Sequence, residues 1–140
     1  MSMHHAYMRS ALQQAVLAME LGEIPIGALL VSPNNIIISG HNHSITMNDP
    51  TSHAEIVVIR EMAKTIANYR LTGCVLYVTV QPCLMCLGAI EHARIATVYY
   101  GASSPKCPVF YHELSKTSLH GPILQTESQE LLKSFFKKRR

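Results

Sequence analysis

Apolar residues recur every three or four positions in three stretches of the chain, at residues 3–21, 53–68 and 127–138. This spacing places them on one face of an α-helix, so each stretch is predicted to be an amphipathic helix. The apolar positions are Met8, Ala11, Leu12, Ala15, Val16 and Met19 in the first stretch, Ile56, Ile59, Met62, Ala63 and Ile66 in the second, and Leu131, Leu132, Phe135 and Phe136 in the third. A shorter helix is predicted from Pro82 to about Ala93, because proline is favoured in the first turn of a helix.

Four other runs are rich in β-branched residues or alternate between apolar and polar positions, which predicts strands. These runs are residues 26–32, 36–39, 74–80 and 97–100. The first two flank the turn-forming sequence Pro33-Asn34-Asn35 and are predicted to form a hairpin. The stretches 40–52 and 101–125 show neither period and are predicted to be irregular.

The predicted order of elements is helix, strand, strand, helix, strand, helix, strand, helix, which is typical of the α/β class. We expect a three-layer α/β/α sandwich in which helices cover both faces of a mixed central sheet. Because a chain of 140 residues suits one hydrophobic core of ordinary size, residues 1–140 are interpreted as a single domain.

Composition argues against a disordered protein and against a membrane-spanning one. Apolar residues make up 48% of the chain, which is too high for a disordered protein. No apolar run approaches the ~20 residues that a membrane-spanning helix needs, and the first residues lack the apolar segment of a signal peptide. We therefore expect a cytoplasmic protein with no membrane partner, in which four cysteines are not a disulfide framework.

Basic charge is concentrated at the end of the chain. Lys and Arg total 12 against 9 Asp and Glu, and four of the basic residues are Lys137, Lys138, Arg139 and Arg140. Such a tail can be a solvated helix end that complements the helix dipole, or it can contact the phosphates of a nucleic acid. The pattern leaves both interpretations open.

Three candidate metal ligands lie at the starts of two predicted helices: His53 in one, Cys83 and Cys86 in the other. The positive end of a helix dipole stabilises thiolates, and the Cys-x-x-Cys spacing allows two sulfurs to reach one ion. Three protein ligands leave the fourth position of a tetrahedral zinc ion open to water, which is typical of a catalytic site. We expect one Zn²⁺ per chain.

Each part of this pattern has an alternative interpretation. Ser52 and Glu55 match a capping box at the start of a helix, and a Cys-x-x-Cys pair can be redox-active. Cys74 and Cys107 stand alone and are predicted to be small buried side chains. The order His-x-Glu followed by Pro-Cys-x-x-Cys, however, is the pattern of zinc nucleobase deaminases. It favours a metal site over the separate interpretations.

Further segments extend this likeness along the chain. They are Asn48–Glu55, Asn68–Leu71, Leu76–Thr79, Pro82–Ile90, Arg94–Ile95, Val98–Ala102 and Leu131–Phe136. By these residues the chain resembles the cytidine/deoxycytidylate deaminase superfamily, and within it the bacterial tRNA adenosine deaminases. The resemblance implies a hydrolase that converts adenosine to inosine at the wobble position, with a tRNA anticodon loop as its partner.

The resemblance also implies roles for particular residues. Glu55 would be the catalytic acid and base, and Asn42 would hydrogen-bond the purine. Ile24, in the segment Glu23–Gly27, would wall the base pocket, and the carbonyl of Pro82 would orient the leaving amine. Members of the family typically form homodimers through the helices that carry the metal ligands.

The chain departs from the family pattern at three places, none of them a metal ligand. Gln81 stands where Glu usually precedes Pro-Cys, and Ser104 stands where the bacterial tRNA enzymes commonly have Asp. Residues 107–120, which include Phe110 and Tyr111, match the family poorly.

Three functions compete at this point. The first is deamination of adenosine in tRNA, which the basic tail and the Asn48–Glu55 segment favour. The second is the same reaction on a small nucleobase or nucleoside, such as guanine, cytosine or adenosine. The third is a non-catalytic, zinc-stabilised binding subunit, which requires Cys74 or Cys107 as a fourth ligand.

Overall fold

The computed structural model describes residues 2–108 and 116–138. Its centre is a sheet in the strand order β2-β1-β3-β4-β5. The strands are β1 (Gly27–Val31), β2 (Ile37–His41), β3 (Val75–Val80), β4 (Thr97–Ala102) and β5 (Ser118–His120). Strand β1 runs antiparallel to its neighbours β2 and β3, whereas β4 runs parallel to its neighbours β3 and β5. The sheet is therefore mixed, and β1 and β2 form the predicted hairpin.

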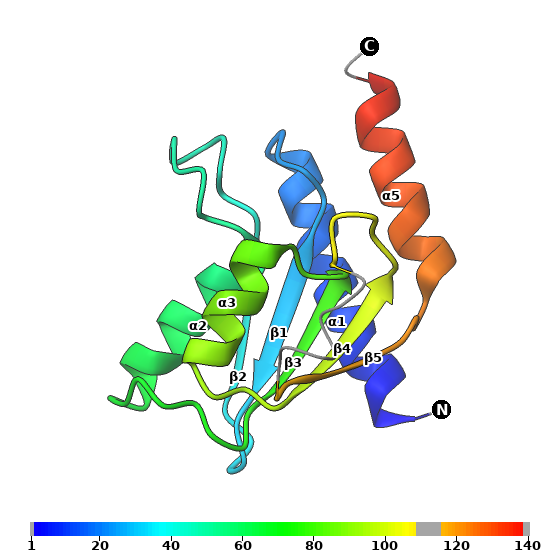
Figure 1. Ribbon diagram of the computed structural model, residues 1–140. Coiled ribbons are helices and arrows are strands. Elements are labelled where there is room, and N and C mark those ends of the chain that lie inside the picture. Colours follow the sequence, from blue (N-terminus) through cyan, green and yellow to red (C-terminus); the bar gives the residue numbers. More distant parts are fainter. Residues whose placement is uncertain (1, 109–115, 139–140) are drawn as a thin grey trace.

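Helices cover both faces of this sheet, as the order of elements predicts (Figure 1). They are α1 (Met3–Glu20), α2 (Ala54–Thr65), α3 (Leu84–His92) and α5 (Gln125–Lys138). Helices α2 and α3 lie together on one face, and α1 and α5 lie on the other. The three-layer α/β/α architecture is confirmed. Among the described residues, no helix combines the length and the hydropathy that crossing a bilayer requires.

Strand β1 lies in the middle of the sheet, and its sequence is a continuous apolar run. Successive side chains of a strand point to opposite faces. Ala28 and Leu30 belong to the core beneath α2 and α3, whereas Leu29 and Val31 belong to the core beneath α1. Because both faces are covered, every residue of β1 is buried, and no alternation remains in its sequence.

One predicted irregular stretch was partly wrong. Residues 101–125 contain the end of β4 and the strand β5, which pairs with β4 in the register Thr97↔Ser118. Strand β5 lies at the sheet edge, and Leu119 is its one apolar residue. With one apolar residue, β5 shows no alternation of apolar and polar positions that would predict a strand. Phe110 and Tyr111 lie outside the described residues.

Candidate metal centre and active site

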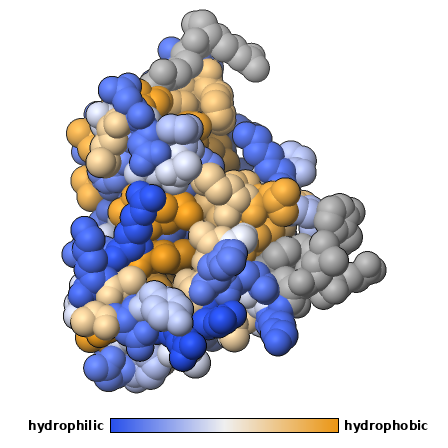
Figure 2. Space-filling view, turned by 60° about the vertical axis from the view of Figure 1, so that its left-hand side comes forward, coloured by the Kyte–Doolittle hydropathy of each residue, from blue (hydrophilic) through white to orange (hydrophobic). Residues whose placement is uncertain are grey.

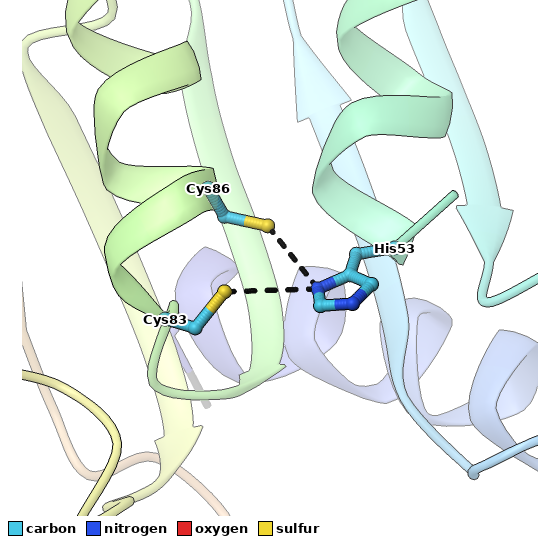
Figure 3. A group of neighbouring side chains, drawn as sticks. All are labelled: His53, Cys83 and Cys86. Carbon is cyan, nitrogen blue, oxygen red and sulfur yellow. Dashed lines mark hydrogen bonds between the residues drawn. The ribbon is translucent and has the colours of Figure 1, made fainter. Parts of the chain in front are cut away.

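The three candidate ligands meet where α2 and α3 begin (Figure 3). His53 is the N-cap residue of α2, and Cys83 is the N-cap residue of α3. Cys86 follows in the first turn of α3 and is buried. Nδ1 of His53 lies 3.7 Å from Sγ of Cys83 and 3.5 Å from Sγ of Cys86. Two separate helix starts therefore point three donor atoms at one place.

This donor set fits zinc. In a tetrahedral site with ordinary Zn–N and Zn–S bonds, a nitrogen and a sulfur ligand are about 3.6 Å apart, which matches both observed separations. One nitrogen and two sulfurs are donors that zinc prefers. Among residues 2–108 and 116–138, the group of possible metal ligands comprises only these three. Cys74 instead lies in the core beneath α2 and α3, so a structural site with Cys74 as fourth ligand does not form.

The two thiols affect each other's protonation. A hydrogen bond from Cys86 lowers the pKa of Cys83 to about 5 against the effect of its burial, and the nearby His53 adds to the lowering. The pKa of Cys86 is raised, first by that hydrogen bond to Cys83 and then by burial. One sulfur is thus already a thiolate near neutral pH, which is the form that ligates a metal.

Glu55 lies in the first turn of α2, next to this cluster, and is buried. Burial raises the pKa of Glu55 to about 7, against the lowering effects of its own backbone N–H and of His53. The capping-box interpretation is wrong, because the N-cap residue is His53 and its side chain makes no capping bond. The N–H of Ala54 instead donates to Oδ1 of Asn42, at 2.8 Å.

A pocket of about 300 Å³ opens beside the cluster. Glu55, His53 and Cys83 line it together with apolar side chains from β3, from α5 and from the segment before β1. The remaining lining residues are Ile24, Ile26, Asn42, Val80, Gln81, Ser104, Lys106, Leu132 and Phe136. A volume of this size, with apolar walls and a few polar groups, is typical of a site for a small molecule or one nucleobase.

Residues 1–102 match the family model described as the cytidine and deoxycytidylate deaminase zinc-binding region. The chain belongs to this deaminase family. Its metal is zinc, and His53, Cys83 and Cys86 are the residues that fit it.

Individual relatives agree with the family. A tRNA-specific adenosine deaminase of Haemophilus influenzae is 47% identical over 146 residues, which cover 95% of this chain and 83% of the relative. A solved structure from work on tRNA deaminases that edit the wobble position has a TM-score of 0.84 at 38% identity, over 91% of this chain and 99% of the other. A guanine deaminase of Bacillus subtilis has a TM-score of 0.70 at 31% identity, over 98% of this chain and 95% of the other. This chain is thus similar to enzymes that act on purines.

Two of the three pocket residues expected in this deaminase line the pocket, namely Ile24 and Asn42. Pro82 is not a lining residue, although its neighbours Gln81 and Cys83 are. Asn42 is buried, and its bond to Ala54 ties the loop before α2 to the helix that carries Glu55.

The sequence did not indicate Val80, Lys106, Leu132 or Phe136 as pocket residues. Leu132 and Phe136 are spaced as a helical stripe, but nothing in a stripe says which surface it covers. Helix α5 packs near β4 and α1 and thereby brings both side chains to the deaminase pocket.

Proposed function

We propose that this protein is a hydrolytic deaminase that converts adenosine to inosine at the wobble position of tRNA. The observation that carries the proposal is the burial of Glu55 beside His53 and the two cysteines, in one pocket large enough for a base. A structural zinc site has no use for such a carboxylate. The likeness to tRNA-specific adenosine deaminases supports the choice of substrate.

The reaction adds water to the base and releases ammonia. Zinc, when bound, supplies an activated water as the nucleophile. Glu55 would accept a proton from water and deliver it to N1 of adenine as the water oxygen forms a bond to C6. Glu55 would then take the proton of the new C6 hydroxyl and pass it to the amine, so that the C6–N bond breaks, ammonia leaves and the oxygen remains as the 6-oxo group of inosine.

The remaining pocket residues would hold the base in place. Ile24 and Ile26 offer apolar surface to the purine faces, and Asn42 offers an amide to a ring edge. The backbone of residues 24–26 is tied to Asn42, whose N–H donates to the carbonyl of Ile26 at 3.2 Å. We assign the orientation of the leaving amine to the carbonyl of Pro82, on the strength of the family resemblance.

A second hollow, of about 460 Å³, adjoins the pocket and favours a polynucleotide over a free base. Leu132 and Phe136 line both hollows, and Lys133 and Lys137 line only the second. A base that leaves its stack to enter the pocket would bring neighbouring nucleotides over these lysines. Because duplex bases cannot reach such a pocket, an anticodon loop is a suitable substrate. A tRNA substrate also agrees with the predicted cytoplasmic location.

We further propose that the protein forms a homodimer through the helices that carry the ligands. On the outer side of α3, the exposed fraction is 66% for Leu84 and 37% for Met85. Gly88, one turn further along, has open space in front of its Cα. Apolar side chains gather in the middle of the face turned toward the viewer in Figure 2, with polar side chains to their left and below them. Large exposed apolar side chains on one helix are typical of a protein–protein contact.

One experiment separates the candidate functions. Purified zinc-loaded protein is incubated with tRNA transcripts, free adenosine, guanine or cytosine, and ammonia release is measured. We expect release from a tRNA that carries adenosine at the wobble position, and none when that base is replaced. Release from guanine alone would favour the small-molecule alternative, to which the guanine deaminase likeness points. No release from any substrate, at full zinc occupancy, would favour the non-catalytic subunit.

A further inference from the structure

The parallel ladder between β3 and β4 ends in an unusual way, directly beside the metal-bearing turn. Val80 pairs with Ala102, and the N–H of Gln81 then donates to the carbonyl of Ala102 at 2.8 Å. In a regular parallel ladder, the next bond would run from the N–H of Ser104 back to the backbone carbonyl of Gln81. That N–H donates instead to the side-chain Oε1 of Gln81, at 2.8 Å.

The orientation of this side chain is fixed by chemistry. A backbone N–H can only donate, so the atom that faces Ser104 must be the amide oxygen and not the amide nitrogen. The side chain of Gln81 therefore replaces the backbone carbonyl of the same residue. This replacement lets β3 turn away into Pro82 and Cys83 while the chain after β4 stays attached to it.

The attached segment, residues 103–107, is folded around Ser104. Oγ of Ser104 accepts from the N–H of Lys106 at 3.2 Å, and the carbonyl of Ser104 accepts from the N–H of Cys107 at 3.2 Å. Ser104 and Lys106 both line the pocket, and Lys106 is exposed. This polar edge of the pocket is thus held by the side chain of Gln81 at 2.8 Å, and a longer bond of 3.4 Å joins the N–H of Ser103 to Oε1 of Gln125.

We propose that Gln81 is a positioning residue, whose side-chain carbonyl holds residues 103–107 against the pocket so that Ser104 and Lys106 face the polynucleotide. The inference rests on the proposed function for its substrate, but the hydrogen bond itself does not. Glu also presents an oxygen to the N–H of Ser104, whereas Met has a similar length and no oxygen. The pair Gln81→Glu and Gln81→Met therefore tests the acceptor alone.

The first measurement is independent of activity. Amide hydrogen exchange at Ser104 reports whether its N–H is bonded. We expect Gln81→Glu to protect this amide as wild type does, and Gln81→Met to exchange it about three- to tenfold faster, the effect of one net hydrogen bond. Equal exchange in all three proteins would overturn the inference, whatever the substrate is.

The second measurement is steady-state kinetics on tRNA. Gln81→Met should raise KM by about three- to tenfold with kcat unchanged, because Glu55 and the metal ligands are untouched. Gln81→Glu should restore the wild-type KM. Gln13→Met, at an exposed position of α1, is the matched control and should have no effect.

The outcomes are distinguishable. If Gln81→Glu is as impaired as Gln81→Met, the acceptor is not what matters and the inference is wrong. An unchanged KM in Gln81→Met would overturn the inference as well. Zinc content and thermal midpoint are measured for each variant, and a loss of zinc in Gln81→Met would assign the residue to the metal site instead. If wild type releases no ammonia from tRNA, the proposed function fails, and hydrogen exchange still decides the role of Gln81.

Discussion

Glu23 and Glu55 are both buried carboxylates, exposed by 1% and 4%, but their surroundings shift their pKa values in opposite directions. Burial pushes the pKa of Glu23 upward, yet hydrogen bonds from Thr46 and Ile45 hold it below the usual value. The two backbone N–H groups donate to separate oxygens, at 2.6 and 3.1 Å. Glu55 accepts from its own backbone N–H and from the thiol of Cys86, but these bonds do not offset its burial, which raises its pKa to about 7.

The comparison shows that the donors around a buried carboxylate decide its use. A carboxylate that accepts a backbone N–H on each oxygen stays ionised and acts as a clamp. Glu23 joins the segment before β1 to residues 45 and 46, in the loop that leads to His53. A carboxylate whose burial outweighs its hydrogen bonds can exchange a proton near neutral pH, which suits a general acid and base.

Glu55→Gln should have the largest effect on activity. Gln can neither accept nor deliver the proton, so turnover should fall by about 10²–10⁴-fold while zinc and the fold are kept. Ammonia release and zinc content are measured together, with Glu61→Gln, exposed on the same helix, as the control. Loss of zinc in Glu55→Gln would assign Glu55 to the metal site and contradict the proposed role.

Leu84→Glu tests the surface outside the pocket, on the same helix as Cys86. A carboxylate at the proposed dimer contact would be buried without a partner, so the dimer should weaken by roughly 30-fold or more, equivalent to about 2 kcal/mol. Sedimentation at several concentrations measures this. Met3→Glu is the matched control, since Met3 is also exposed by 66% but lies on α1. Equal dissociation in both variants would contradict the contact on α3.

Glu23→Gln disrupts the pair of hydrogen bonds that Glu23 accepts and should lower the stability of the fold. An amide has one acceptor oxygen, and its NH₂ group would face a backbone N–H, so the free energy of unfolding should fall by about 1–3 kcal/mol. Chemical denaturation measures the change, and Glu20→Gln, exposed at the end of α1, is the control. A large loss of kcat with unchanged stability would mean that Glu23 is not a clamp.

The same variant has a pH signature. Because the folded pKa of Glu23 is lowered, its contribution to stability is present above the unfolded value of about 4.3 and is lost as pH falls through the folded value. The stability difference between wild type and Glu23→Gln should therefore shrink as the solution is acidified below about pH 4.3. A difference that grows in acid would contradict the ionised clamp.

Deletion of Lys137 to Arg140 should have the smallest effect on the rate of deamination. The surroundings of Glu23 and Glu55 should stay unchanged. Lys137 and Lys138 end α5, and Arg139 and Arg140 lie outside the described residues. Up to four phosphate contacts would be lost, so the slope of log affinity for tRNA against log salt should become shallower by up to about 2.8. Equal slopes for the full-length and truncated proteins would leave the tail as a helix end only.

The sequence by itself determined the described helices, strands β1 to β4 and the three residues that fit the metal. Helix periods, the hairpin around Asn34, the His-x-Glu motif at residues 53–55 and the Cys-x-x-Cys motif at residues 83–86 are local patterns, because each depends on residues a few positions apart in the chain. The two motifs themselves are 30 positions apart, and the fold brings them together. Their chemistry follows from residue type, although the capping signal of Ser52 and Glu55 did not mark the N-cap of α2, which is His53.

Only the tertiary structure decided what surrounds these residues. The two clamp bonds of Glu23, the bond from Ser104 to Gln81 and the approach of Phe136 to the pocket join residues more than 20 positions apart. Such contacts depend on how the sheet is ordered and how α5 packs on it, and no local period encodes either. Strand β5 was missed for the same reason, because its pairing with β4, and not its own composition, makes it a strand.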